Sequence, residues 1–280
     1  MNPVSDTAFY TCGIRAQDAE STNPVCDDRY AKRFMNARGT EVFSIFSGDK
    51  MGSNAHLARH SMIDQLVRAR LARDPNTYVV TIGAGFDSRP YRIPGGAWVE
   101  LDEPGVIEYK NERLAAADCT NALSRISVDF GRDHLYEKLP RLLPAAKVIV
   151  VIEGVFFYLT EEQICETLEA LHRAYPGHEL ICDLMTRQLI ESRYRKNHKE
   201  LQQMNAPFRF LSDAPCSTFT RTGYRLVSRA SILTRTFELM WNRGIASLLG
   251  WVMPKMANGY TVCTFESTAD GTPGQGRRLG

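Results

Sequence analysis

The fold is decided by the stretch YVVTIGAGFDSR, residues 78–89. Three of its first five residues are both β-branched and apolar, which predicts a strand covered on both faces. Gly83 and Gly85 then let the backbone turn sharply and approach a ligand closely. Asp87 falls where the N-cap of a following helix would lie. We therefore predict a buried strand, a glycine turn and the start of a helix.

An acidic residue, Asp102, follows Gly83 by nineteen residues and ends a second apolar stretch that starts at Ala97. This spacing is typical of α/β sheets that bind a nucleoside, with the acid on the ribose hydroxyls. The third glycine of a dinucleotide fingerprint is replaced by Ser88, and Asp87 would repel a pyrophosphate. S-adenosylmethionine has no phosphate and carries a sulfonium and an ammonium group, so the turn suits this cofactor better than NAD.

The composition favours an ordinary globular protein of 280 residues, either one large α/β domain or two small ones. The net charge of +2 gives no reason to expect a nucleic-acid partner or an acidic membrane. Seven scattered cysteines without a C-x-x-C pair indicate free thiols in a reducing compartment, and no Cys/His group has zinc spacing. Without a secretory signal or a long apolar run, we expect a cytoplasmic location and no metal.

Strands alternate regularly with helices, which predicts a doubly wound α/β fold with a mostly parallel, seven-stranded sheet. Five strands are expected near 77–82, 97–101, 124–128, 148–152 and 178–184, and two closing strands near 224–227 and 259–265. Helices are expected over 104–118, from a cap at Thr160 to about residue 175, and over 231–250.

The regions around this sheet are expected to have separate tasks. Residues 1–56 form an N-terminal arm and helical cap, in which residues 1 to about 25 are either a flexible arm or a segment that orders over a site. A helix there is broken at Gly39, a loop lies between Gly48 and Gly52, and a long helix covers 54–73. Residues 57–266 form the main domain, with 186–222 as a lid or substrate wall, and 267–280 are a disordered tail.

One acidic residue stands at each of four successive predicted strand ends: Asp87, Asp102, Asp129 and Glu153. Ligands of such sheets lie beyond the carboxyl ends of the strands. Capping of the next helix explains Asp87 as well as ligand binding does, but it explains Glu153 poorly, because Glu153 directly follows five apolar residues. A buried carboxylate needs a partner, and the cationic groups of the cofactor would provide one.

Four stretches together carry a family resemblance: ARHSMID at 58–64, IGAGFDSR at 82–89, VELDEP at 99–104 and EGVFFYL at 153–159. Over residues 27–266 the chain resembles the leucine carboxyl methyltransferase family, which includes bacterial polyketide carboxyl O-methyltransferases. The resemblance implies the Rossmann-like fold of class I methyltransferases. It also implies S-adenosylmethionine as cofactor, S-adenosylhomocysteine as product, and a small-molecule acceptor from secondary metabolism.

The resemblance also implies roles for individual residues. Arg59 would pair with the carboxylate of the cofactor, Glu153 with its ammonium group and Asp102 with its ribose. The whole implied cofactor set is Arg59, Gly83, Ala84, Gly85, Asp87, Asp102, Asp129, Phe130 and Glu153, with Asp129 and Phe130 flanking the adenine. Tyr158 would face the acceptor as the catalytic residue; the alternatives are a core tyrosine at 158 and an exposed helix arginine at 59.

The acceptor decides whether a base is needed. A carboxylate is already ionised at pH 7, so proximity and fixed electrostatics suffice for methyl transfer to it. A phenol has a pKa near 10 and would need a base to remove its proton. Base candidates are His56, His60 and His198, and candidates to hold the acceptor are Arg29, Lys32, Arg33, Arg193 and Arg195. A terminal leucine of a protein is a further acceptor by family analogy. An NAD-dependent oxidoreductase and a non-catalytic binding protein are the alternative classes.

Overall fold

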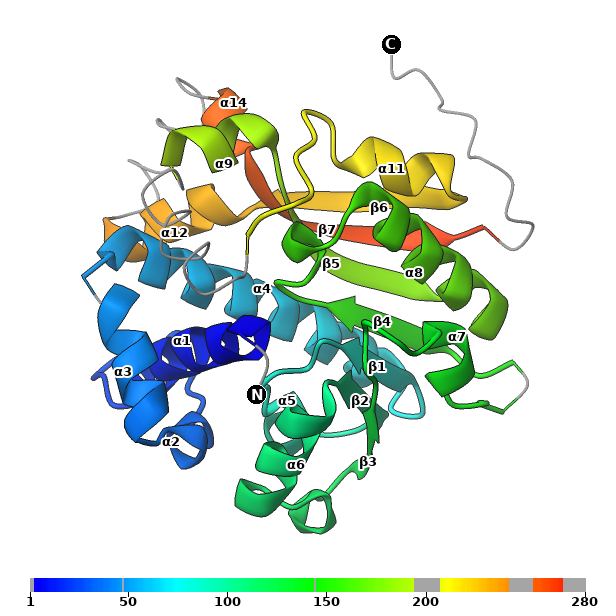
Figure 1. The fold of residues 1–280 in the computed structure, drawn as a ribbon, viewed down its shortest axis with the longest axis horizontal. Coiled ribbons are helices and arrows are strands. Elements are labelled where there is room, and N and C mark those ends of the chain that lie inside the picture. Colours follow the sequence, from blue (N-terminus) through cyan, green and yellow to red (C-terminus); the bar gives the residue numbers. More distant parts are fainter. Residues whose placement is uncertain (1–2, 47, 144, 194–206, 242–253, 269–280) are drawn as a thin grey trace.

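A seven-stranded sheet in the order β3-β2-β1-β4-β5-β7-β6 forms the centre of the protein (Figure 1). The computed structural model describes residues 3–46, 48–143, 145–193, 207–241 and 254–268. The strands are β1 (Tyr78–Ile82), β2 (Ala97–Asp102), β3 (Ala122–Ser127), β4 (Val148–Ile152), β5 (Glu179–Met185), β6 (Tyr224–Ser231) and β7 (Tyr260–Ser267). Strands β1 to β5 pair in parallel, and β7 lies antiparallel between β5 and β6. The predicted fold class is confirmed.

Helices cover both faces of this sheet because successive strand residues point to opposite sides. Val79 of β1 belongs to an apolar cluster with helices α4 and α12, while its neighbour Val80 belongs to a cluster with α8. The helices are α1 (Pro3–Asp18), α2 (Ala31–Phe34), α3 (Ala37–Phe46), α4 (Lys50–Arg73), α5 (Arg89–Arg92), α6 (Pro104–Arg113), α7 (Leu135–Lys138), α8 (Glu161–Ala174), α9 (Arg187–Arg193), α11 (Cys216–Arg221), α12 (Ile232–Met240) and α14 (Pro254–Ala257).

Two predictions about the N-terminal helices are wrong. Gly39 does not break a helix: α3 runs through it, and a Cβ there would lie 2.5 Å from the ring of Phe9. The glycine therefore serves the close packing of α3 against α1. The long helix α4 begins at Lys50 rather than Asn54, because Asp49 accepts a hydrogen bond from the backbone of Gly52 and caps it.

Other helices match the predictions more closely at their start than at their end. The side chain of Thr160 accepts from the backbone of Gln163 at the start of α8, and the capping box is complete. The helix predicted over 104–118 ends at Arg113. Of the helix predicted over 231–250, residues 242–253 lie outside the described part of the chain, as do 194–206 of the expected lid and 269–280 of the tail.

The N-terminal residues 3–18 form helix α1, which lies with α2 and α3 beside α4 at one end of the sheet (Figure 1). Buried Arg15 fixes this helix to the glycine turn. It donates to Asp28 at 2.9 Å and to the carbonyl oxygen of Phe86 at 2.8 Å. The expected boundary after residue 56 falls inside α4, and the division into an arm and a main domain stays a prediction.

Candidate functional site

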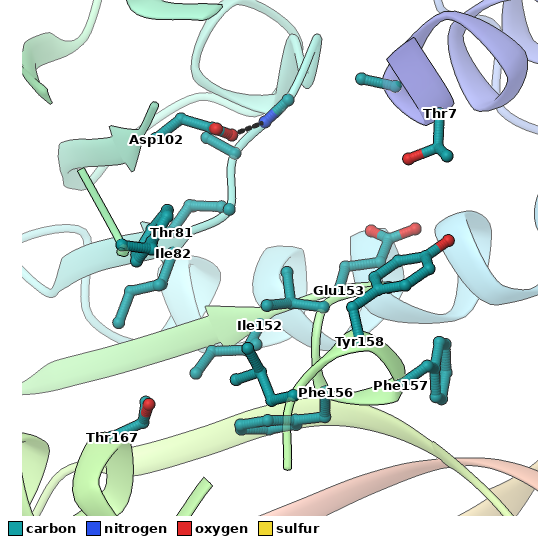
Figure 2. Close-up of a pocket in the computed structure, with 18 of the residues that line it drawn as sticks. Thr7, Thr81, Ile82, Asp102, Ile152, Glu153, Phe156, Phe157, Tyr158 and Thr167 are labelled. Atoms are coloured by element: carbon teal, nitrogen blue, oxygen red, sulfur yellow. Dashed lines mark hydrogen bonds between the residues drawn. The ribbon is translucent and has the colours of Figure 1, made fainter. Parts of the chain in front are cut away.

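A cavity of about 1070 Å³ opens at the carboxyl ends of the parallel strands. Its walls come from α1, α4, the glycine turn, the ends of β2 and β4, and residues 207–209. Figure 2 shows Asp102 on one side of it and Glu153 and Tyr158 on the other. Pockets for one drug-sized ligand measure roughly 300–1,000 Å³, so this cavity has room for a cofactor and a second molecule.

The glycine turn forms one edge of the cavity and needs its glycines. Gly83 and Gly85 have φ values of 67° and 46°, in the left-handed region that side chains disfavour. A Cβ on Gly83 would also lie 2.3 Å from Cγ2 of Val155. The predicted turn therefore brings bare backbone to the cavity, together with Ala84, as a nucleoside site requires.

Asp102 lies at the end of β2 and is held by the backbone. Its Oδ2 accepts from the amide of Gly85 at 2.6 Å, and its Oδ1 accepts from the amide of Glu103 at 2.7 Å. Burial raises the pKa of this carboxyl group. Each carboxylate oxygen can still accept another hydrogen bond, so Asp102 is positioned to receive two hydroxyl groups.

Arg59 of α4 is buried beneath the cavity rather than exposed. It donates to Glu153 at 2.9 Å, to Asp183 of β5 at 3.1 Å and to the hydroxyl of Tyr260 at 2.8 Å. Its Nη2 makes no hydrogen bond to any residue in the described part of the chain, and the side chain lines the cavity. Arg59 therefore keeps a donor for a ligand carboxylate.

Arg59 belongs to a larger buried charge cluster under the glycine turn. Arg89 connects three carboxylates, donating to Asp64 at 2.6 Å and to Asp87 and Glu153 at 2.7 Å each. The cluster consists of Arg59, Asp64, Asp87, Arg89, Arg92, Glu153 and Asp183, with His60 among them. When all its acids are ionised, it has one carboxylate more than guanidinium groups. That balance favours a ligand with net positive charge.

Two members of the cluster differ in what they offer a ligand. Asp87 lines the cavity and lies one residue before Ser88, the N-cap position of α5; its two oxygens accept from the backbone amide and the guanidinium group of Arg89. Glu153 lines the cavity, and although burial opposes its ionisation, Arg89, His60 and Arg59 hold its pKa well below its usual value. Glu153 is therefore a carboxylate that faces the cavity. Its position directly after five apolar residues indicated that it would need a partner.

The residues expected beside the adenine separate in the structure. Phe130 lines the cavity and is 37% exposed. Asp129 is not among the lining residues; it accepts from the backbone of Gly131 and lies 3.6 Å from Arg132. Asp129 lies at the edge of the sheet because it follows β3, but its carboxylate accepts a hydrogen bond within the turn that comes next.

Tyr158 lines the opposite part of the cavity, next to α1. Its ring stacks on Phe208 at 5.7 Å, its hydroxyl interacts with Thr7, and burial raises its pKa. Figure 2 shows its hydroxyl pointing towards Thr7. Tyr158 therefore both packs against the apolar core and lines the cavity, and its role towards an acceptor stays a prediction.

Of the five predicted acceptor-holding cations, the three that the structure describes, Arg29, Lys32 and Arg33, are absent from the cavity lining. Arg29 is 80% exposed and pairs with Asp27, and neither Lys32 nor Arg33 lines the cavity. The side chain of Arg193 and the whole of Arg195 and His198 lie outside the described residues. Arg15, Arg173 and Arg209 line the cavity instead.

Sequence reasoning missed Asp183, Tyr260 and the helical structure of residues 3–18, which form α1. Asp183 accepts from Arg59, from Tyr260 and from the amide of Gly154, and so fixes the loop that carries Glu153. A signal was available, because an aspartate within an apolar strand needs a buried partner. Nothing in the weak pattern of residues 3–18 identified α1.

No group of three or more metal-ligating side chains occurs among the described residues. In the same part of the chain, none of the helices is long and apolar enough to cross a membrane.

Comparisons with known proteins agree with this geometry. The family model for leucine carboxyl methyltransferases matches residues 8–172, more than half of the chain. A protein of Parafrankia is 31% identical over 193 residues, which span 63% of this chain and 62% of that protein. One of Mycobacterium ulcerans is 28% identical over 234 residues, 72% of each. Both relatives have a provisional assignment as S-adenosyl-L-methionine-dependent methyltransferases.

Two solved structures support the fold. A DUF574 family protein of Streptomyces avermitilis superposes with a TM-score of 0.60 at 14% identity, covering 89% of this chain and 99% of that one. Magnesium protoporphyrin IX methyltransferase of Synechocystis, with bound S-adenosylhomocysteine, gives 0.51 at 13% identity, covering 86% and 100%. The fold is thus that of class I methyltransferases, and the cofactor is S-adenosylmethionine. The chain therefore belongs to the leucine carboxyl methyltransferase family, a family of S-adenosylmethionine-dependent enzymes.

Proposed function

We propose that this protein is an O-methyltransferase that converts a carboxylate of a small molecule of secondary metabolism, of polyketide type, into a methyl ester in the cytoplasm. The observation that carries the proposal is that the two candidate histidines lining the cavity, His56 and His60, are both buried with lowered pKa values. An acceptor that is already ionised needs no base.

The two candidate bases that the structure describes, His56 and His60, are unsuited to remove a proton near pH 7. Burial and the charge of Arg59 lower the pKa of His56 to about 3. His60 lies beneath the cavity with its ring nitrogens 2.8 Å from Arg89 and 2.9 Å from Arg92, and burial together with Arg89 lowers its pKa. Burial raises the pKa of Tyr158. A phenol, the alternative acceptor, would therefore keep its proton here.

The residues that would hold the cofactor fit its chemical groups. We assign the ribose hydroxyls to Asp102, the ammonium group to Glu153 and the carboxylate to Nη2 of Arg59. When bound, S-adenosylmethionine supplies a methyl group activated by the adjacent sulfonium. The protein's own contribution is to fix the acceptor oxygen in line with that methyl group and to exclude water, which is mainly proximity and preorganisation.

Attraction of an anionic acceptor requires a positive charge that is not already neutralised. Arg209 lines the cavity beside Phe208, and it makes no ion pair with a residue in the described ranges. The guanidinium groups of Arg15 and Arg59 are paired with carboxylates. Arg173 also lines the cavity, but its guanidinium group lies over the ring of Tyr136, 4.0 Å from the ring centroid. Arg209 is therefore the cation that we expect to draw a carboxylate towards the aromatic end of the cavity.

The test uses methyl-labelled S-adenosylmethionine and an extract of the source organism as the pool of acceptors. Mild alkali hydrolyses methyl esters and releases labelled methanol, whereas aryl methyl ethers survive. We expect alkali-labile label. Alkali-stable label would move the assignment to a phenol, and no transfer together with quenching of NADH fluorescence on binding would favour the oxidoreductase.

A further inference from the structure

His56 is a lining residue whose chemistry the cofactor site does not use. It lies on α4, one turn before Arg59 and His60, and its ring forms part of the cavity wall. The ring of Tyr10 packs edge-on against it at 5.1 Å and 87°. Its Nδ1 is sealed from solvent and has no hydrogen-bond partner in the described part of the chain.

This environment decides which nitrogen of His56 carries the proton. A neutral imidazole has one N–H donor and one lone pair. A proton on the sealed Nδ1 would be an orphaned buried donor, which native structures rarely tolerate, whereas an orphaned acceptor costs less. The proton therefore belongs on Nε2, and the depressed pKa of His56 keeps the ring neutral at working pH.

Helix α1 brings His56 and Tyr158 to the same part of the cavity. Thr7 interacts with the Tyr158 hydroxyl, and Tyr10 packs on His56. Residues three apart in a helix share one face and lie about 5–6 Å apart at Cβ. His56 and Tyr158 thus flank the space under one face of α1, and Figure 2 shows Thr7 and Tyr158 across the cavity from Asp102.

We propose that His56 determines acceptor specificity: its Nε2–H donates a hydrogen bond to one oxygen of the acceptor carboxylate and orients the other towards the methyl group. This inference rests on the proposed carboxylate function. A hydrogen bond to a charged oxygen is roughly twice as strong as one to a neutral oxygen. The same donor therefore holds the ester product less tightly than the acid, which promotes its release.

The protonation state can be tested without any acceptor, by long-range ¹H–¹⁵N correlation spectra of the full chain with S-adenosylhomocysteine bound. We expect the proton on Nε2 and no titration of His56 between pH 5 and pH 9. Addition of benzoate should shift the Nε2 resonance. A proton on Nδ1, a titration midpoint near 6.5, or no response to benzoate would overturn the proposal.

Two variants then separate a positioning role from a structural one. His56→Phe keeps the size of the ring without a donor, and His56→Gln restores an N–H. In the presence of S-adenosylhomocysteine, we expect His56→Phe to weaken benzoate binding at least tenfold and His56→Gln to recover most of it, with cofactor affinity within twofold. Unchanged benzoate affinity in His56→Phe, or a parallel loss of cofactor affinity, would contradict the assignment.

The outcomes distinguish the role of His56 from the proposed carboxylate methylation on which it rests. Alkali-labile methyl transfer combined with a His56→Phe variant that binds benzoate normally would leave the carboxylate function in place and remove only the role of His56. Alkali-stable transfer would remove the carboxylate function itself. Because the spectra need only the wild-type protein, the inference stays falsifiable even where the variants fail to fold.

Discussion

Replacement of Asp102 by asparagine gives the sharpest test of the cofactor site. The carboxylate is fixed by two short backbone hydrogen bonds, from Gly85 and Glu103, and is only 8% exposed. Each of its oxygens keeps a lone pair for one ribose hydroxyl. Asparagine has similar shape but no charge and only one oxygen, so it loses one acceptor and weakens the other.

The expected loss follows from these contacts. A hydrogen bond to a charged group contributes about 1.5–3 kcal/mol and a neutral one about 0.5–1.5 kcal/mol. Losing one charged bond and weakening the other costs about 3 kcal/mol, which is roughly a hundredfold in affinity. We therefore expect Asp102→Asn to raise the Kd of S-adenosylhomocysteine about a hundredfold in titration calorimetry.

A matched control variant and a coupling measurement test whether the loss of affinity comes from the contact between Asp102 and the ribose. Asp129→Asn makes the same change at the end of the next strand, outside the cavity lining, and should alter affinity less than twofold. Adenosine and 2′,3′-dideoxyadenosine, each measured on wild type and Asp102→Asn, isolate the ribose term. If the preference for adenosine is equally large in both proteins, Asp102 does not bind the ribose and the reasoning fails.

Three further predictions concern stability. Gly83→Ala puts a Cβ at positive φ and against Val155, so urea unfolding should show a loss of at least about 2 kcal/mol; an unchanged midpoint would contradict the turn geometry. Burial lowers the pKa of His178 to about 4, and the neutral ring accepts from the hydroxyl of Tyr224. The unfolded chain thus binds more protons than the folded chain between pH 6.5 and 4. The neutral ring therefore contributes about 3 kcal/mol to the free energy of unfolding above pH 6.5, and this contribution is lost as the pH falls towards 4. In His178→Phe, this part of the pH dependence of the free energy of unfolding should vanish. Thr160→Ala removes the cap of α8 and should cost about 1 kcal/mol in thermal unfolding, while Thr160→Ser should cost little.

The sequence was most informative where structure depends on neighbours along the chain. The apolar runs, the glycine turn and the cap of α8 are local patterns, and each appears in the structure within a few residues of its predicted place. The position of Asp102 and Glu153 at one edge also followed from the sequence. Parallel strands bring their carboxyl ends together, whatever else surrounds them.

Local sequence patterns predicted the wrong role for some residues whose role depends on contacts with other side chains. Gly39 resembles a helix breaker, but it admits the ring of Phe9 from another helix. Asp87 resembles a helix cap, but Ser88 holds the N-cap position of α5, and Asp87 accepts from the backbone and the guanidinium group of Arg89. Asp129 shares the position of Asp102 after a strand, yet the turn after β3 uses its carboxylate.

The sequence by itself determined the fold class and the edge of the sheet at which the cavity opens, because both depend on the order of the elements. Only the tertiary structure decided which charges remain available there. Arg59 pairs with Glu153, 94 residues away in the sequence, and with Asp183, 124 residues away, and α1 contacts Tyr158 through Thr7. The strength of a charge or a base depends on burial and on its nearest partners, and those are set by packing between elements far apart in the chain.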